Sequence, residues 1–239
     1  MPTLKSLLRR AINSVGYDIR RPHENPSWSL LGLKGYAIRS VMDIGANEGQ
    51  FARFIGRHFP DAMIFAFEPL QAPFANLRML ESSGKLKAFN CALGDHETKA
   101  EMYLHCDHSP SSSLLATTPT SCDLFPFTES QQKVPISVST LDRFCEQHQR
   151  DIQDEILVKM DVQGYEERVI DGGMNVLGRA RACIVEANLE SLYVGQASFS
   201  TIVVKLASVG LSYAGNLGQV HAADGRAIYL DAVFIRAGE

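Results

Sequence analysis

Two carboxylates in the first third of the chain stand where a nucleotide-binding protein would use them. Asp43 lies near the end of the apolar run 38–44, and Glu68 directly follows the apolar run 62–67. A turn with two glycines, Gly45 and Gly49, connects the first run to a helical pattern over 49–58. Strand, glycine turn and helix in this order form the first unit of a nucleotide-binding α/β sheet, in which ligands bind at the carboxyl ends of the strands. The sequence therefore predicts a ligand site that contains both carboxylates.

The spacing of the turn indicates which ligand this is. A pyrophosphate-binding turn reads G-x-G-x-x-G and offers bare backbone amides to a dianion. Here the turn reads D-x-G-x-x-x-G, so a carboxylate stands where it would repel phosphate. A ligand with an ammonium group and a sulfonium suits this turn better, and S-adenosylmethionine has both. We therefore expect an S-adenosylmethionine site formed by Asp43, Gly45, Ala46, Asn47 and Gly49. The alternative for Asp43 is a turn or helix-capping aspartate.

Glu68 supports a nucleoside ligand. A carboxylate about 20 residues beyond a glycine turn can accept hydrogen bonds from both ribose hydroxyls. Sites for NAD and for S-adenosylmethionine share this feature, so Glu68 indicates a nucleoside and Asp43 indicates which one. A solvated strand end is the alternative for Glu68. Pro69, together with Asn90 and Cys91 at the end of the next expected strand, 86–91, completes the predicted cofactor site.

Length and composition fit one large α/β domain. The chain has 239 residues, a hydrophobic content of 45% and a formal net charge of −4. This charge gives no support for a nucleic-acid partner, because such proteins usually carry a basic excess. The five cysteines include no C-x-x-C pair, no apolar run is long enough to span a membrane, and the N-terminus lacks a secretory h-region. A cytoplasmic protein with reduced thiols is the expectation.

Strand and helix patterns alternate from residue 38 onward, which is typical of a parallel, doubly wound sheet. Further apolar strands are expected over 155–161 and 182–186, and they end in Asp161 and Glu186. The runs 211–214 and 228–235 are suited to a terminal hairpin. We expect residues 31–239 to form this domain, preceded by an N-terminal helix and linker over 1–30.

Residues 105–132 interrupt the alternation with polar, proline-containing sequence. A loop of this length within a compact domain is usually a lid or a binding element. It begins with His105, Cys106, Asp107 and His108, a set of metal-ligating types, but adjacent residues rarely converge on one ion and no distal ligand pair is visible. No metal is therefore expected. We expect the loop to line the acceptor pocket, with Ser112 and Ser113 contacting the substrate.

Residues 1–25 form a basic amphipathic pattern. The apolar residues of one helical face are Leu4, Leu7, Leu8, Ala11, Ile12 and Val15. The basic residues that lie off this face are Lys5, Arg9 and Arg10, and the basic residues that follow are Arg20 and Arg21. Such a helix can lie on an anionic membrane surface. Amphipathic helices in soluble proteins more often face a core. We therefore expect this helix to pack on the domain or on a second subunit, as in a homodimer.

Four short motifs occur in an order that is typical of one protein family. They are Asp43–Gln50 (D-I-G-A-N-E-G-Q), Phe67–Pro69, Leu141-Asp142 and Lys159–Glu166 (K-M-D-V-Q-G-Y-E). Over about residues 38–190, the chain resembles the FkbM family of S-adenosylmethionine-dependent methyltransferases. The resemblance implies a class I methyltransferase fold, with a Rossmann-like seven-stranded sheet whose last strand is antiparallel, and O-methylation of sugar or polyketide hydroxyls. The family usually has glutamate at the position of Gln163, so we expect Gln163 and Glu186 to orient the substrate by hydrogen bonds.

Methyl transfer to a hydroxyl requires in-line positioning and benefits from a base. Asp161, at the carboxyl end of a strand beside the cofactor site, is the expected base, and His105 and His108 are second candidates. The alternative for Asp161 is a helix cap. The acceptor would be a small molecule or glycan with a free hydroxyl. Two other functions are open: a NAD or nucleotide-sugar enzyme, which the turn spacing disfavours, and a non-catalytic partner protein that keeps the fold.

Overall fold

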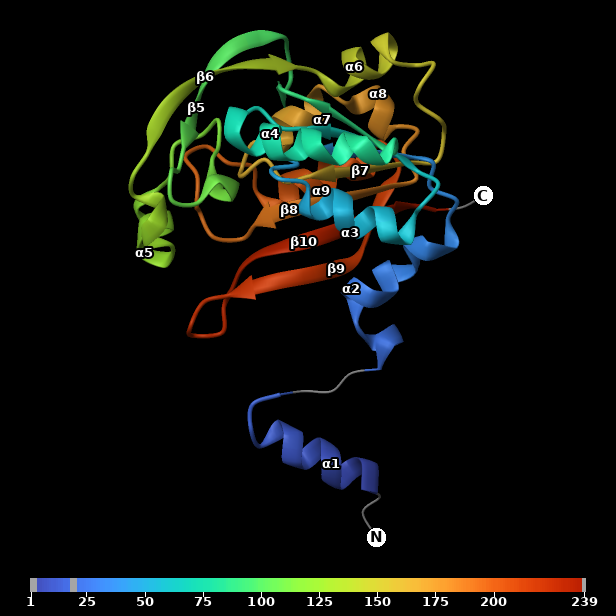
Figure 1. The fold of residues 1–239 in the computed structure, drawn as a ribbon. Coiled ribbons are helices and arrows are strands. Elements are labelled where there is room, and N and C mark those ends of the chain that lie inside the picture. Colours follow the sequence, from blue (N-terminus) through green and yellow to red (C-terminus); the bar gives the residue numbers. More distant parts are fainter. Residues whose placement is uncertain (1–3, 18–20, 238–239) are drawn as a thin grey trace.

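A seven-stranded sheet forms the centre of the protein (Figure 1). The computed structural model describes residues 4–17 and 21–237. The strands lie in the order β3-β2-β1-β7-β8-β10-β9. Their bounds are β1 Ser40–Ile44, β2 Met63–Phe67, β3 Leu86–Phe89, β7 Ile156–Met160, β8 Ala182–Asn188, β9 Leu211–His221 and β10 Ala227–Arg236. The first five strands of this order pair in parallel, and β10 is antiparallel to both of its neighbours.

This arrangement is that of a class I methyltransferase, and it confirms the predicted fold class. The terminal hairpin is also confirmed, although β9 continues to His221 instead of ending at 214 because it pairs with β10 along most of its length. The expected third strand, 86–91, is divided. Residues Leu86–Phe89 belong to the central sheet, and β4 (Ala92–Leu93) leaves it to join a second sheet.

Helices cover both faces of the central sheet, as a doubly wound topology requires. One face carries α3 (Gln50–His58), α4 (Gln71–Arg78) and the 3₁₀ segment Leu30–Gly35, whose buried residues include Ile55, Leu77 and Leu33. The other face carries α6 (Leu141–Gln147), α7 (Glu166–Asp171), α8 (Met174–Leu177) and α9 (Phe199–Ser208). Side chains of successive strand residues alternate between the two cores: Val41 belongs to the first and Met42 to the second. These two cores hold the strand ends in place.

The segment expected to be a long irregular loop is partly structured. Strand β5 (Thr98–Leu104) and strand β6 (Gln132–Ser139) pair antiparallel, and with β4 they form a three-stranded sheet. Between them lie a 3₁₀ turn, Ser109–Ser111, helix α5 (Pro119–Leu124) and a second 3₁₀ turn, Pro126–Thr128. The segment is fastened to the domain at Thr117, which bridges to Tyr193. Its mobility as a lid stays a prediction.

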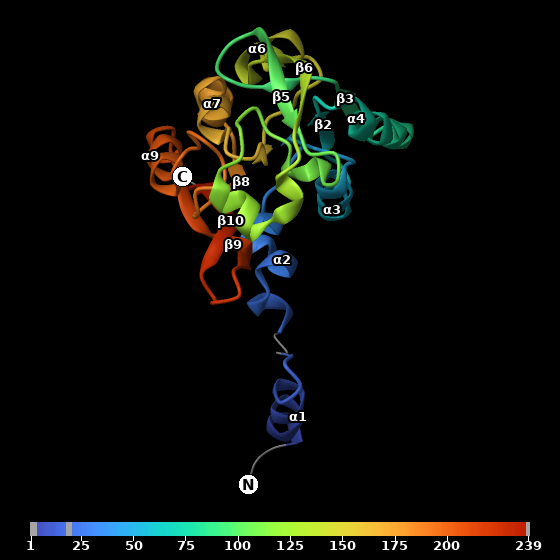
Figure 2. The same ribbon diagram turned by 90° about the vertical axis from the view of Figure 1, so that its left-hand side faces the viewer.

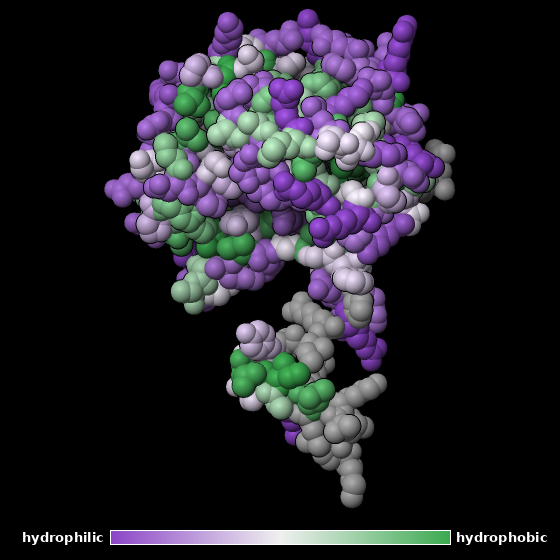
Figure 3. All heavy atoms as spheres, viewed as in Figure 1, coloured by the Kyte–Doolittle hydropathy of each residue, from purple (hydrophilic) through white to green (hydrophobic). Residues whose placement is uncertain are grey.

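Helix α1 (Leu4–Asn13) lies apart from the domain, beyond helix α2 (Pro26–Ser29) (Figures 1 and 2). Leu8 is 57% exposed and Val15 is 69% exposed. Figure 3 shows hydrophobic residues gathered on this helix. The expected packing on the domain is therefore not seen for its described residues, and packing on a second subunit stays a prediction. The predictions for Arg20, and for the side chains of Leu4, Lys5, Leu7 and Arg9, concern residues or side chains outside those that the structure describes. Within the ranges that the structure covers, no helix is both long enough and apolar enough to cross a bilayer.

Candidate active site

The glycine turn between β1 and α3 is fixed by contacts with neighbouring strand ends. The backbone N–H groups of Gly45 and Ala46 donate to the carbonyl oxygen of Phe67, at 3.0 and 2.9 Å. Gly45 has a φ of 79°, and a Cβ built on it would lie 1.9 Å from the backbone oxygen of Asp161. Glycine is therefore required here because the loop after β7 crosses directly against the turn.

Glu68 is held at the end of β2 by the backbone around it. Its side chain is buried, Oε2 accepts from the N–H of Asn47 at 2.9 Å, and Oε1 accepts from the N–H of Leu70 at 2.8 Å. Burial is the largest influence and raises the pKa of Glu68 to about 7, while these two hydrogen bonds oppose it. The side chain of Asn90 donates to the carbonyls of Glu68 and Pro69, both at 3.0 Å. Asn90 thus fixes the turn that presents Glu68.

A cleft of about 600 Å³ opens beside Glu68, and we call it the cofactor cleft. Five of the predicted cofactor residues line it, namely Gly45, Asn47, Glu68, Pro69 and Cys91. Four others lie outside the lining: Asp43, Ala46, Gly49 and Asn90. Apolar side chains form much of the remaining wall, among them Phe67, Leu93, Met102 and Leu114.

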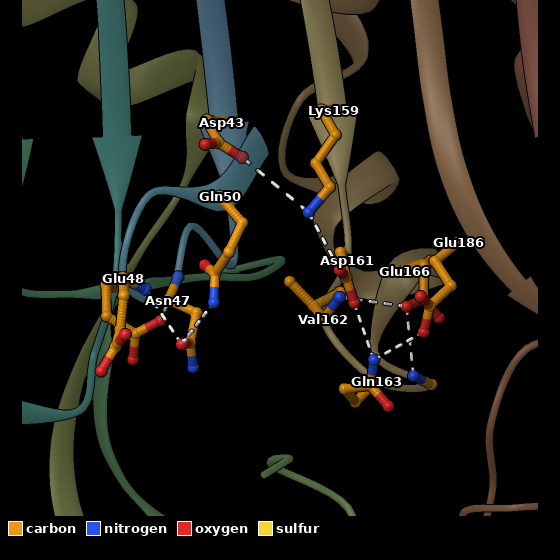
Figure 4. A network of polar contacts seen from close by, with 12 residues as sticks. Asp43, Asn47, Glu48, Gln50, Lys159, Asp161, Val162, Gln163, Glu166 and Glu186 are labelled. Carbon is orange, nitrogen blue, oxygen red and sulfur yellow. Dashed lines mark hydrogen bonds and ion pairs between the residues drawn. The ribbon is translucent and has the colours of Figure 1, made fainter. Parts of the chain in front are cut away.

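Asp43 of β1 is fully buried, and Figure 4 shows its side chain facing Lys159. Neither of its carboxylate oxygens accepts a hydrogen bond from the residues that the structure describes, and the Nζ of Lys159 lies 3.9 Å from Oδ1. Burial raises the pKa of Asp43 to about 6, and the charge of Lys159 partly offsets this effect. Burial alone would lower the pKa of Lys159, but Asp161 and Asp43 together raise it above its ordinary value. Asp43 therefore does not line the cofactor cleft, whereas Asp161, like Glu68, does.

A second cavity of about 530 Å³ adjoins the cofactor cleft, and we call it the acceptor pocket. Asp161 and Pro110 line both cavities, so the two spaces meet at these residues. The pocket combines carboxylates with aromatic rings: Glu186, Phe125, Phe127, Tyr193 and Tyr229 face it. Sequence reasoning missed the two tyrosines, which lie in the loop after β8 and in β10. No motif surrounds either of them.

Gln163 links the two carboxylates of the pocket (Figure 4). Its Nε2 donates to Asp161 Oδ1 at 2.7 Å and to Glu186 Oε1 at 2.6 Å. Its Oε1 accepts from the hydroxyl of Tyr193 at 2.6 Å. The other oxygen of Asp161 accepts from Lys159 Nζ at 2.9 Å. Because an ionised glutamate has no hydrogen to donate, glutamine is the residue that can join two carboxylates in this way.

The backbone at Gln163 is itself constrained, with a φ of 54°. Glu166 stabilises this loop because its Oε1 accepts from the N–H of Val162 at 3.3 Å and from that of Gly164 at 3.1 Å. Glu166 is buried, and burial raises its pKa to about 7. The helix-cap alternative for Asp161 is therefore wrong: Glu166 binds the loop amides, and Asp161 faces the two cavities.

Glu186 is paired across the sheet with another carboxylate. Asp231 of β10 stands opposite Glu186 of β8 in the antiparallel register. Burial, followed by the charges of Asp161 and Asp231, raises the pKa of Glu186 well above its ordinary value. Burial and Asp161 likewise raise the pKa of Asp231 to about 6. The acceptor side of the site is thus a region in which carboxylates gain protons easily.

The two candidate histidines have different surroundings. His105 is buried, its Nδ1 lies 3.2 Å from the carbonyl of Ser130, and its Nε2 has no hydrogen-bond partner. It lines neither cavity, so the structure does not support it as a base. His108 lines the acceptor pocket, with Nδ1 2.8 Å from the hydroxyl of Ser111 and its ring against Phe127. Burial lowers the pKa of His105.

The two serines expected to contact substrate are also separated. Ser112 lines the cofactor cleft, and its hydroxyl accepts from the backbone N–H of His105. Ser113 is fully buried, and its hydroxyl donates to the backbone carbonyl of Gln163 at 2.7 Å. Neither lines the acceptor pocket, which Ser111 and Ser121 reach instead. Within the described ranges no three His, Cys, Asp or Glu side chains are arranged to hold a metal ion.

These residues fit S-adenosylmethionine. Each oxygen of Glu68 accepts one backbone hydrogen bond and retains capacity to accept a second, which suits the two neighbouring hydroxyls of a ribose. The apolar wall of the cleft suits an adenine ring. The cleft is also lined by Asp161, whose carboxylate suits a cationic group.

The comparisons with known proteins agree with this geometry. The model of the methyltransferase FkbM domain matches residues 43–213. The chain belongs to the FkbM methyltransferase family. S-adenosylmethionine is accordingly its cofactor, and the alternative of a NAD enzyme is not retained. The match covers the glycine turn, Glu68, the Asp161 loop and Glu186, so it includes the cofactor cleft and all of the acceptor pocket except Tyr229.

Individual FkbM relatives are distant. The 2-O-methyltransferase NoeI of Sinorhizobium fredii is 27% identical over 179 residues, which are 72% of each protein. Methyltransferase 1 of Beauveria bassiana is 27% identical over 144 residues, covering 55% of this chain and 57% of that protein. A crystal structure of a methyltransferase FkbM from Methylobacillus flagellatus matches with a TM-score of 0.51 at 12% identity, covering 83% of this chain and 44% of the other. This last likeness shows a shared fold.

Proposed function

We propose that this FkbM methyltransferase transfers a methyl group from S-adenosylmethionine to a hydroxyl of a sugar, a glycan or a secondary metabolite. The observation that carries the proposal is the acceptor pocket, which meets the cofactor cleft at Asp161 and combines carboxylates with aromatic rings. Carboxylates accept hydrogen bonds from hydroxyl groups. The apolar faces of aromatic rings suit the carbon face of a sugar. The name of the relative NoeI, a 2-O-methyltransferase, points in the same direction.

The work of this chain is to position two reactants and to move one proton. When bound, S-adenosylmethionine supplies a methyl group activated by a positively charged sulfur. Glu68 would hold the ribose, the apolar wall would hold the adenine, and Asp161 would face the cationic end. Holding an acceptor oxygen in line with the methyl group is a positioning task that rigid strand ends perform well. Asp161 and Gln163 follow β7, and Glu186 lies within β8, which continues to Asn188 and not, as expected, only to Glu186.

Water must be kept from the junction between the two cavities. The 3₁₀ turn Ser109–Ser111 contributes Pro110 to both linings, so it lies over that junction. It is tied to the cofactor side because Asn47 Nδ2 donates to Ser109 Oγ at 3.1 Å. It is tied to the acceptor side because the one hydroxyl hydrogen of Tyr193 is shared between Gln163 Oε1 at 2.6 Å and the carbonyl oxygen of Ser111 at 2.9 Å.

Transfer of a radiolabelled methyl group tests the proposal. The purified protein would be incubated with methyl-labelled S-adenosylmethionine and with three classes of acceptor: methyl hexopyranosides, primary amines and carboxylic acids. We expect label on the hexopyranosides, in a bond that resists alkaline hydrolysis as an ether does. Label on amines or carboxylic acids alone would contradict O-methylation of a hydroxyl. Binding of S-adenosylhomocysteine without transfer to any class would favour a non-catalytic protein of this fold.

A further inference from the structure

Several groups near the acceptor pocket could receive the proton that a hydroxyl loses on methylation, and their contacts distinguish them. Asp161, Glu186 and His108 line the pocket. Each oxygen of Asp161 accepts one hydrogen bond, Oδ1 from Gln163 Nε2 at 2.7 Å and Oδ2 from Lys159 Nζ at 2.9 Å. A proton added to either oxygen would compete with a donor that is already there. Asp161 is therefore poorly suited to the role that sequence reasoning gave it.

Glu186 differs in that only one of its oxygens is bound. Its Oε1 accepts from Gln163 Nε2 at 2.6 Å. Its Oε2 accepts no hydrogen bond from the part of the chain that the structure describes. This oxygen is not fully buried, and Glu186 lines the acceptor pocket. We propose that Glu186 Oε2 receives the proton of the acceptor hydroxyl, and that Gln163 and Asp161 are positioning residues. This inference rests on the proposed function.

Gln163 determines which oxygen of Glu186 is presented. Its amide is oriented by three partners, because Nε2 donates to two carboxylates while Oε1 accepts from the hydroxyl of Tyr193. Reversing the amide would set its oxygen against both carboxylates and its NH₂ group against a donor. The Glu186 side chain is therefore held by Oε1, and Oε2 is left toward the acceptor.

The charges around Glu186 favour its protonated form. Lys159 of β7 and Asp161, which follows β7, act on it with opposite signs, and Asp231 of β10 adds a second negative charge. Tyr193 and Tyr229 line the same pocket, and burial, followed by Glu186, raises the pKa of each phenol, that of Tyr229 to about 12. Both phenols therefore stay neutral. Burial and the two neighbouring carboxylates raise the pKa of Glu186, and a carboxylate with a raised pKa is the stronger base once it is ionised.

The proposed step is balanced. The O–H bond of the acceptor breaks and its proton passes to Glu186 Oε2. The electron pair of that bond stays on the oxygen, which forms the new bond to the methyl carbon. The carbon–sulfur bond breaks with its electrons on sulfur and leaves S-adenosylhomocysteine. Glu186 then releases the proton to water as the product leaves the pocket.

Glu186→Gln tests the assignment, because glutamine still offers an oxygen to Gln163 but cannot accept a proton. The probe is whichever of methyl α-D-glucopyranoside, methyl α-D-mannopyranoside and methyl α-D-galactopyranoside the wild type methylates fastest. We expect kcat to fall at least about 100-fold, the usual scale of general-base help. S-adenosylhomocysteine affinity and Tm should stay at the wild-type values. Asp161→Asn serves as the comparison, and a larger loss of kcat there than in Glu186→Gln would return the role to Asp161.

A pH profile separates proton transfer from a structural role. The wild-type kcat should rise with pH through the raised pKa of Glu186 and then level, and this rise should vanish in Glu186→Gln. Asp231→Asn removes a neighbouring negative charge and should move the midpoint of the rise to lower pH, whereas the exposed Asp224→Asn should leave it in place. An unmoved midpoint in Asp231→Asn, or an unchanged rise in Glu186→Gln, overturns the inference. Wild type that labels only amines overturns the proposed function as well, so the two failures are distinguishable.

Discussion

Replacing Glu68 by alanine separates two contributions that the structure assigns to one side chain. In the ligand-free protein its oxygens accept from two backbone N–H groups, those of Asn47 and Leu70. Each buried N–H that loses its acceptor costs about 1–3 kcal/mol, so stability should fall by about 2–6 kcal/mol. At about 2–4 °C for each kcal/mol in a chain of this size, Tm should fall by about 5–20 °C. The loss arises without any ligand.

Cofactor affinity should fall as well. Two hydrogen bonds from a ribose to one carboxylate are worth about 2–4 kcal/mol, so the Kd of S-adenosylhomocysteine should rise about 30- to 800-fold. Because hydroxyl donors favour the ionised carboxylate, the wild-type affinity should also rise with pH through the pKa of about 7, and Glu68→Ala should lose this dependence. Isothermal titration calorimetry between pH 6 and 8 measures both.

Glu81→Ala is a matched control. Its Oε1 accepts from the backbone N–H of Ala88 at 2.9 Å, and it does not line the cofactor cleft. Tm should fall by the amount expected when one backbone N–H group loses its acceptor, about half of the fall in Glu68→Ala, while the Kd of S-adenosylhomocysteine should stay unchanged. Wild-type affinity in Glu68→Ala would show that the ribose does not bind at the end of β2, and an unchanged Tm would refute the reasoning about the two amides.

Three further predictions concern stability and the loop. Gly45→Ala should lower the free energy of unfolding by more than about 3 kcal/mol, because its Cβ would overlap the Asp161 carbonyl. Gly195 has the same left-handed backbone but open space around it, so Gly195→Ala should lower the free energy of unfolding by only about 1–2 kcal/mol. Chemical denaturation measures both. In the folded protein the pKa values of Asp43, Glu68 and Glu166 are raised to about 6, 7 and 7. The stability that these protonated groups contribute is complete at a pH below their unfolded-state pKa values and is lost as the pH rises through 7. Tm measured from pH 5 to 8 should therefore fall, and a rise across this window would contradict these shifts. Limited proteolysis of the domain should cut first within 105–132, and S-adenosylhomocysteine should slow that cleavage, whereas a resistant loop would end the lid hypothesis.

The sequence alone predicted those features that depend on the residues of one short segment. The glycine turn, the carboxylate after β2 and the order of strands were all predictable, since each depends on local spacing and on the rule that parallel strand ends meet at one edge. Glu68 is the clearest case. Its predicted place at the end of a buried strand coincides with its place in the cofactor cleft.

The acceptor pocket depends on contacts between distant segments, and these could not be predicted. Tyr193 and Tyr229 reach it from a loop and from the last strand, with no motif around either. A weak signal existed for Asp231 and Lys159, which are lone charges in otherwise apolar strands. The roles within the Lys159–Glu166 motif also depend on tertiary contacts, because only the pairing of Gln163 with Glu186 shows which carboxylate keeps a free oxygen.

The turn Ser109–Ser111 has a thermodynamic consequence. Three consecutive residues contact both sites, with Ser109 bound to Asn47 of the glycine turn and Ser111 bound to Tyr193 of the acceptor pocket. A ligand that shifts this turn changes the affinity at the other site, and linkage makes the effect reciprocal. Methyl donor and acceptor should therefore change each other's affinity by the same factor.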